Sequence, residues 1–243
     1  MEDRYEHELH CSKDVDRLLR EFDKVSKHFQ KALEPETSSM QIIQIVQESR
    51  AEYIRLIPDL PNIGGSKNPF YYNLIGSAWL LALFKTLENF GFELREIGRI
   101  GYATFENYID SYSSLTKFFF RTFMYSRFTK KRMQESAKKS QEHEYQDDWV
   151  YSFVEGVDGD FEWGVDFTEC AIYKFYKKQG AERFLPYICL GDYAMYSSFG
   201  VGMKRSKTLG SGHSHCDFRY VKGYKTPRGW PPEDLEEFQI MDI

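Results

Sequence analysis

Three of the four cysteines in this 243-residue chain lie in its last third, among the side chains best suited to chemistry. Cys189 and Asp192 stand three residues apart in a segment expected to be helical, so they share one helix face. Cys216 lies in a strand-like segment whose alternation places it on the side facing the core. A buried cysteine usually acts as a small hydrophobic side chain, but a thiolate is also a strong nucleophile near neutral pH. Cys170 opens an intervening helix, so the three thiols could converge on one sheet.

Further polar side chains follow in the strand-like segment 213–221. Alternation places four of them on the side opposite to Cys216: His213, His215, Asp217 and Arg219. A zinc site built from the two histidines and the thiol is disfavoured, because they do not share a strand face and the chain has no C-x-x-C motif. The glycine pair at 64–65 lacks the spacing of a phosphate-binding loop. We therefore expect neither a metal nor an organic cofactor.

Composition excludes several classes of protein. The chain has 32 Lys and Arg against 37 Asp and Glu, a net charge of −5, which is unlike a general nucleic-acid binder. Aromatic residues make up 17% of the chain, too many for a disordered protein, and four cysteines are too few for a disulfide scaffold. The charged N-terminus is unlike a secretory signal, and the apolar stretch 74–84 is shorter than the roughly 20 residues of a membrane span. We expect a cytoplasmic protein with reduced thiols and no membrane partner.

Hydrophobic periodicity divides the chain into two regions. Residues 1–145 predict helices that begin at Ser12 and at Thr37 or Ser38, followed by helices over about 70–91, 94–112 and 115–145. The remaining segments predict a hairpin of 149–154 with 161–167, helices over 168–178 and 181–199, and a second hairpin of 201–209 with 213–221. We expect an α+β fold, in which an N-terminal helical half (1–145) packs on a C-terminal antiparallel sheet with two helices (146–243), as one integrated domain with a pocket between the halves. The tail 227–243 is expected to pack Trp230 and Phe238 on the surface.

An ordered series of motifs resembles the L-2-amino-thiazoline-4-carboxylic acid hydrolase family. The series is TEC at 168–170, CLGD at 189–192, RSKTLG at 205–210 and GHSHCDFR at 212–219, and PNIGGSKN at 61–68 resembles the N-terminal half of that family. The resemblance covers roughly residues 40–221. The chain departs from the family in its last turn, where the family often has Gly-Gly and this chain has Gly210-Ser-Gly212 with two extra histidines.

The resemblance implies a hydrolase that opens a cyclic, amidine-like C–N or C–S bond of a small-molecule substrate. A thiolate at Cys189 or Cys216 could attack, with the choice between them open, or Asp192 could activate a water molecule or act as general acid and base. A neighbouring arginine or a protonated His215 would lower the thiol pKa. The expected substrate-binding residues include arginines for a carboxylate and an amide for the amidine: Asn68, Cys170, Arg205, Thr208 and Arg219.

Alternatives from other classes remain open. A Cys-x-Phe ending after a glycine also occurs in small-molecule-binding domains of the four-vinyl-reductase type, which favours a non-catalytic sensor as the second hypothesis. The basic run 127–139 would serve a protein-interaction domain, although a solvated helix face explains it more simply. Aromatic residues near the motifs, if they line a pocket, suit a larger or aromatic substrate and a tailoring enzyme of specialised metabolism. A homodimer is a possible assembly.

Overall fold

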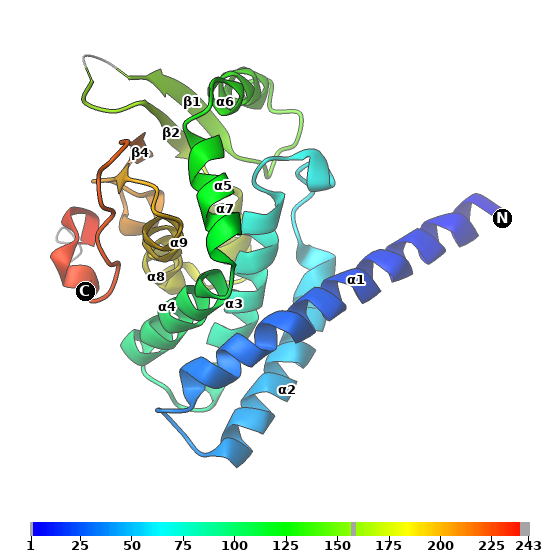
Figure 1. Ribbon diagram of the computed structural model, residues 1–243. Coiled ribbons are helices and arrows are strands. Elements are labelled where there is room, and N and C mark those ends of the chain that lie inside the picture. The colour runs from blue at the N-terminus through cyan, green and yellow to red at the C-terminus, as the bar shows by residue number, and fades with distance from the viewer. Residues whose placement is uncertain (1, 157–158, 239–243) are drawn as a thin grey trace.

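The computed structural model describes residues 2–156 and 159–238, and side chains from residue 15 onward. Six helices precede the sheet, in the order that Figure 1 shows. Their bounds are Glu2–Leu33 (α1), Ser39–Leu56 (α2), Tyr71–Asn89 (α3), Leu94–Asp110 (α4), Ser114–Met124 (α5) and Arg127–Ser140 (α6). The second half contains the strands Val150–Glu155 (β1), Trp163–Glu169 (β2), Met203–Lys204 (β3) and Cys216–Tyr220 (β4), with the helices Ala171–Lys178 (α7), Leu185–Cys189 (α8) and Gly191–Phe199 (α9) between β2 and β3. The protein therefore has the expected α+β fold.

The apolar helix α3 lies at the centre of the molecule. Most of its side chains are buried, because α2, α4 and α7 pack around it. The Tyr176 hydroxyl of α7 donates a hydrogen bond of 2.9 Å to the carbonyl of Ser77 in α3, which satisfies a buried polar group between the two halves of the chain. Buried side chains form one continuous core from α1 to the C-terminal tail.

All neighbouring strands in the sheet are antiparallel, in the order β1-β2-β4-β3. Alternation along β4 buries Cys216, Phe218 and Tyr220, whereas Asp217 and Arg219 lie half-buried on the other face. Both predicted hairpin pairings are present. Because β4 begins at Cys216, the two histidines at 213 and 215 lie in the preceding loop and not on the strand, which corrects the expected alternation there.

Three predicted helices have different bounds in the structure. The first begins at Glu2, ten residues before the expected start at Ser12. The helix expected over 115–145 is two helices, because the Ser126 hydroxyl accepts a hydrogen bond from the backbone N–H of Thr129 and caps α6. The helix expected over 181–199 is divided into the 3₁₀ turn Glu182–Phe184, then α8 and α9, and Pro186 stands in the first turn of α8.

The C-terminal tail packs against α4 and α8. The Trp230 ring lies 6.3 Å from the rings of both Tyr102 and Tyr187, and Phe238 is buried beside Tyr187. Two short 3₁₀ turns, Pro232–Asp234 and Glu236–Phe238, lie within this segment. Across the residues that the structure describes, none of the helices has both the length and the hydropathy of a membrane span.

Glycines in α4 allow close packing of neighbouring helices, which gives the first testable prediction. A Cβ at Gly101 would lie 2.4 Å from Cε1 of the buried Phe84 ring in α3. We expect Gly101→Ala to lower the free energy of unfolding by about 1–3 kcal/mol, because the ring cannot move without disturbing the core. Chemical denaturation measures this change.

The matched control is Gly76→Ala, in α3. A Cβ at Gly76 would meet no atom closer than 4.0 Å, so this substitution gains helix propensity, and we expect it to stabilise the protein by up to about 1 kcal/mol. Equal effects of the two substitutions would show that α3 and α4 do not pack as described.

Candidate active site

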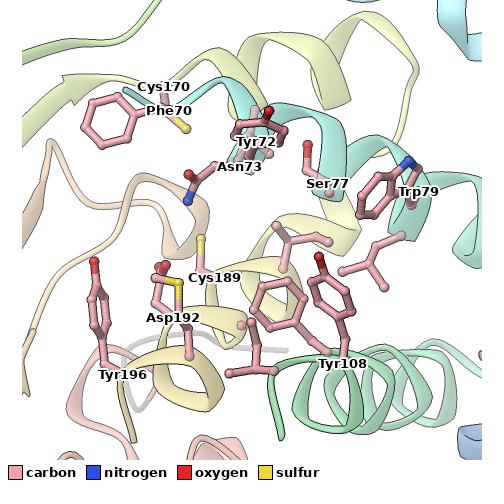
Figure 2. A pocket seen from close by; sticks show the side chains of 18 of the residues that line it. Phe70, Tyr72, Asn73, Ser77, Trp79, Tyr108, Cys170, Cys189, Asp192 and Tyr196 are labelled. Atoms are coloured by element: carbon pink, nitrogen blue, oxygen red, sulfur yellow. The ribbon is translucent and has the colours of Figure 1, made fainter. Parts of the chain in front are cut away.

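A cavity of about 720 Å³ lies between the N-terminal helices and the sheet with its helices. Residues of α1, α3, α4 and α5 line one side, and residues of α7, α8, α9, β2 and β4 line the other. Figure 2 shows its polar end at Cys189, Asp192 and Tyr196, and its opposite end at Trp79 and Tyr108. The lining is mostly apolar and aromatic, as is typical of ligand-binding cavities.

All three cysteines of the second half line this cavity. Cys170 is the N-cap residue of α7, Cys189 ends α8 and Cys216 begins β4. Burial raises the pKa of each thiol, for Cys216 to about 12 and for Cys189 well above the ordinary range of a cysteine. At neutral pH the thiols are therefore protonated, so a reaction through a thiolate needs a group that accepts the proton.

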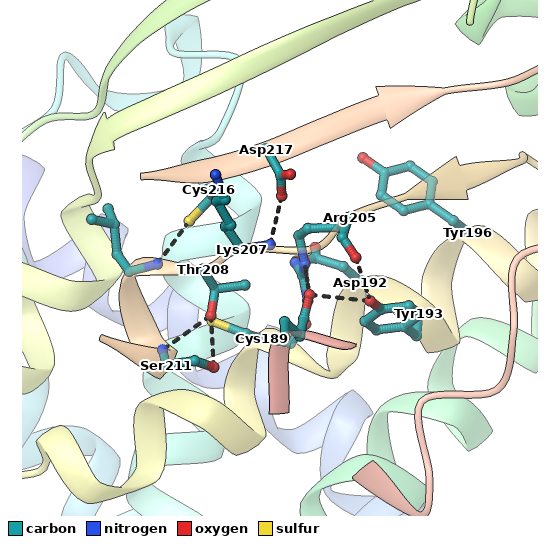
Figure 3. Close-up of polar contacts among 12 residues, drawn as sticks. Cys189, Asp192, Tyr193, Tyr196, Arg205, Lys207, Thr208, Ser211, Cys216 and Asp217 are labelled. Atoms are coloured by element: carbon teal, nitrogen blue, oxygen red, sulfur yellow. Dashed lines mark hydrogen bonds and ion pairs between the residues drawn. The ribbon is translucent and has the colours of Figure 1, made fainter. Parts of the chain in front are cut away.

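Arg205 is held in a buried network beside Cys189 and Asp192 (Figure 3). Its guanidinium group donates to both carboxylate oxygens of Glu237, at 2.7 and 2.6 Å, and to Asp192 Oδ2 at 2.6 Å. A fourth hydrogen bond of 2.8 Å reaches the carbonyl of Cys189. The side chains of Arg205 and Glu237 are each 1% exposed. The local dielectric constant is therefore low, which strengthens the attraction between the two charges.

Asp192 carries the second carboxylate of the network and faces the cavity. About a quarter of its side chain (26%) is accessible, and the residue lines the cavity. Burial raises the pKa of the Asp192 carboxyl, although the Arg205 guanidinium opposes this shift. Within the described residues, its Oδ1 atom has no hydrogen-bond partner, so this oxygen is available to a ligand or to a thiol proton.

The loop between β3 and β4 brings the backbone close to two thiols. Asp217 accepts hydrogen bonds from the backbone N–H groups of Ser206 and Lys207, and the Thr208 hydroxyl accepts one from Ser211 N–H at 3.0 Å. The loop then turns through the 3₁₀ helix Leu209–Ser211, where Leu209 N–H donates to Cys216 Sγ at 3.2 Å.

Gly210 stands against the Cys189 thiol in the same loop. A Cβ at this position would lie 2.9 Å from Cys189 Sγ, so the loop reaches the thiol only because residue 210 is a glycine. This contact places the end of α8 against the turn that precedes β4.

Four residues expected to contact substrate or take part in catalysis lie elsewhere. Asn68 donates to both oxygens of Asp148 and to the carbonyl of Ile63, so it stabilises its own loop. Arg219 pairs with Asp166 at 2.7 Å on the opposite face of the sheet from Cys216. Thr208 caps the loop described above, and His215 contacts Ser214. None of the four is among the described residues that line the cavity.

Two residues of the site were not anticipated from the sequence. Glu237 belongs to an acidic run in the tail, whose pattern is that of a solvated surface, and nothing local marks it as the partner of a buried arginine. Asn73 lies in the first turn of α3, and Figure 2 shows its amide in the cavity, directed toward Cys189. A polar residue at the start of an otherwise apolar helix was the available signal. In the described part of the chain, no three His, Cys, Asp or Glu residues are grouped so that they could hold a metal ion.

The buried arginine gives the second prediction. Arg205→Met leaves Glu237 buried without its cation, so we expect the free energy of unfolding to fall by about 3–5 kcal/mol. The control is Arg219→Met, which removes a pair whose side chains are 25% and 30% exposed and which should cost at most about 1 kcal/mol. Urea denaturation of the two variants measures the difference, and equal losses would contradict a central role for Arg205.

Comparison with known proteins identifies the family. The sequence profile of the family described as L-2-amino-thiazoline-4-carboxylic acid hydrolase matches residues 83–220, more than half of the chain. Neither the curated proteins nor the solved structures contain a match. The matched region includes the three thiols of the cavity, Asp192 and Arg205, whereas Asn73 and Glu237 lie outside it. The chain belongs to the L-2-amino-thiazoline-4-carboxylic acid hydrolase family.

Proposed function

We propose that this protein is a hydrolase that opens a cyclic, amidine-like C–N or C–S bond, using a cysteine nucleophile. The observation that carries the proposal is the convergence of three thiols and the Asp192 carboxylate in one largely aromatic cavity. A carbon bonded to nitrogen and sulfur through a C=N group needs a nucleophile and a proton carrier for its opening, and these side chains can supply both. Family membership supports the reaction class and leaves the substrate open.

Cys189 is the best-placed nucleophile of the three. Arg205 lowers its pKa more than any other neighbouring group, which partly offsets the effect of burial. Cys216 is 8% exposed, and its sulfur already accepts the Leu209 N–H. Cys170 lies at the start of α7, where backbone N–H groups of that helix stabilise its thiolate, so it is the second candidate.

Asp192 is the proposed proton carrier. In the first step the Cys189 sulfur bonds to the amidine-like carbon, the C=N electron pair moves to nitrogen, and the thiol proton passes to the Asp192 carboxylate. The ring bond then breaks, and the leaving ring atom takes its electron pair together with the proton from Asp192. In the last step water bonds to the carbon and the Cys189 sulfur leaves with a proton, so that one water molecule is consumed per turnover.

The large cavity also suits a tailoring enzyme of specialised metabolism, because it accommodates a substrate larger than a single amino acid derivative. One observation favours the second hypothesis, a non-catalytic sensor: the raised thiol pKa values keep the cysteines protonated and unreactive when no proton acceptor acts on them. A sensor would return its ligand chemically unchanged after incubation, whereas a hydrolase would return a product heavier by one water.

The third prediction concerns the nucleophile. Cys189→Ala should lower the hydrolysis rate of 2-aminothiazoline-4-carboxylate or a larger analogue by about 1,000-fold or more, because the covalent step is lost. Cys216→Ala is the matched control and should stay within about tenfold of the wild-type rate, since it changes only the cavity wall. The intact wild-type protein should also carry a substrate-derived mass adduct during turnover. A Cys189→Ala variant with an unchanged rate would exclude Cys189 as the nucleophile, and Cys170→Ala would then distinguish the second candidate thiol from water activated by Asp192.

The fourth prediction concerns pH. Asp192 must be ionised to accept the thiol proton, and its pKa is raised above the usual range of an aspartate by burial. The value of kcat/KM should therefore fall as the pH drops through this raised pKa, so the acid limb of the profile should lie above the usual aspartate range. Asp192→Asn should remove this limb together with most of the activity. An acid limb that persists in the variant would assign the proton transfer to another group.

A further inference from the structure

We propose that the cavity selects an organic cation: an amidinium or ammonium group that pairs with Asp192, joined to an aromatic or extended apolar body that reaches toward Trp79 and Tyr108. The proposal rests on the proposed function in one respect, since it takes this cavity as the substrate site. It goes further in naming the charge and the size of the molecule that the cavity accepts.

The charges at the polar end favour a cation. Arg205 contributes one positive charge, and Glu237 and Asp192 contribute two negative charges when both are ionised. Because Glu237 binds the guanidinium through both of its oxygens, it neutralises Arg205 without needing Asp192. The buried group therefore has an excess negative charge, which faces the cavity on Asp192. Arg205 compensates Asp192 only in part, because it shares its one charge with Glu237, and a bound cation would complete the compensation.

The same geometry disfavours a substrate carboxylate at Arg205. Four donor contacts of the guanidinium are already made, to the two carboxylates and to the Cys189 carbonyl. Its flat faces are also covered, by the rings of Tyr193 and Phe218, whose centroids lie 5.0 and 4.8 Å away. A carboxylate entering here would meet an arginine without free faces and would lie beside two anions. The expected pairing of Arg205 with a substrate carboxylate is therefore replaced by a pairing of Asp192 with a substrate cation.

Aromatic walls support the same charge preference. Tyr196, Phe218 and Tyr220 line the cavity near Asp192, and aromatic faces attract organic cations in sites that exclude water. Asn73 reaches into this end from α3, and within the described residues its side-chain amide makes no hydrogen bond. Figure 2 draws the amide nitrogen toward Cys189, so the carbonyl oxygen accepts from an N–H group of the cation once the amide group flips. An amidinium offers donors in two directions, which fits Asp192 on one side and Asn73 on the other.

The volume sets the size of the ligand. About 720 Å³ lies within the range of roughly 300–1,000 Å³ that holds drug-sized ligands, and a single small amino acid derivative would leave most of it empty. Away from Asp192 and Arg205 the lining is dominated by aromatic and aliphatic side chains, among them Trp79, Phe105 and Phe120. Glu21 and Lys24 of α1 also line the cavity, so the part of the ligand beyond the cationic group should be mainly, though not entirely, apolar.

Binding of a matched series of probes tests the proposal. The probes are 4-phenylbenzamidine, 4-phenylbenzamide and 4-phenylbenzoate, which share a biphenyl body and differ in charge, together with acetamidine, which has the cation without the body. Titration calorimetry on the Cys189→Ala protein measures affinity with the proposed nucleophile removed. We expect the affinity for 4-phenylbenzamidine to exceed the affinities for the amide and for the carboxylate by about 30-fold or more. Acetamidine, which lacks the biphenyl body, should bind more weakly than 4-phenylbenzamidine.

One variant and its control test whether Asp192 is the carboxylate that pairs with the cation. Asp192→Asn should weaken binding of the biphenyl amidine by about 30-fold or more and leave binding of the amide nearly unchanged. Asp166→Asn is the control, because it removes a carboxylate of the sheet that pairs with Arg219 and is not among the described lining residues. If Asp192→Asn does not fold, the order of affinities among the four probes still shows whether the cavity prefers a cation. A carboxylate that binds as tightly as the amidine overturns the proposal.

The test separates this inference from the proposed function. Tight, Asp192-dependent binding of the amidine, with no hydrolysis of any cyclic amidine by the wild-type protein, would support the ligand class and contradict the hydrolase. Hydrolysis of a neutral or anionic ring compound, with no preference for the cationic probe, would support the hydrolase and overturn the ligand class.

Discussion

The buried ion pair between Arg205 and Glu237 is the interaction on which the site depends. It joins three parts of the chain that are distant in sequence: the residue after β3, the start of α9 through Asp192, and the C-terminal tail. The same guanidinium holds the carbonyl of Cys189, so the end of α8 is positioned by the same group. A buried arginine is tolerated only when its charge is compensated, and this requirement brings the tail against the body of the protein.

Burial around this pair controls the reactivity of the neighbouring groups. The surroundings that strengthen the contacts of Arg205 also raise the pKa values of the three thiols and of Asp192. The thiols are thereby made weaker acids, while the aspartate becomes a better proton acceptor. A thiol whose pKa lies well above the ordinary cysteine range gives its proton to a carboxylate only at a cost in free energy, so in the proposed reaction this transfer must accompany formation of the sulfur–carbon bond. The close approach of Gly210 to Cys189 Sγ limits the space on the other side of the thiol.

Local patterns predicted much of the fold. The hairpin of β1 and β2, the cap of α2 at Ser38 and the alternation along β4 follow from neighbouring residues, whose preferences persist in the folded protein. The breaks in the long helices were missed. A cap such as Ser126 competes with continuation of the helix, and the packing of the two flanking segments decides between these outcomes. The start of α1 was misplaced because its first ten residues are charged and show no periodicity.

The sequence by itself determined which functional groups were available, because residue type fixes the thiol, carboxylate and guanidinium groups, whereas their reactivity depends on where the fold places them. The order of the motifs also resembled that of the family, whose profile matches residues 83–220. Five residues of those motifs line the cavity: Cys170, Cys189, Asp192, Arg205 and Cys216. Only the tertiary structure decided which polar residues reach it. Asn68 and Arg219 pair with Asp148 and Asp166 outside the cavity. Glu237 enters the site from a segment without a local signal, and for Asn73 the only signal is its polarity at the start of an apolar helix. The physical reason is that charge compensation and access to a cavity depend on contacts between distant segments, which no spacing along the chain encodes.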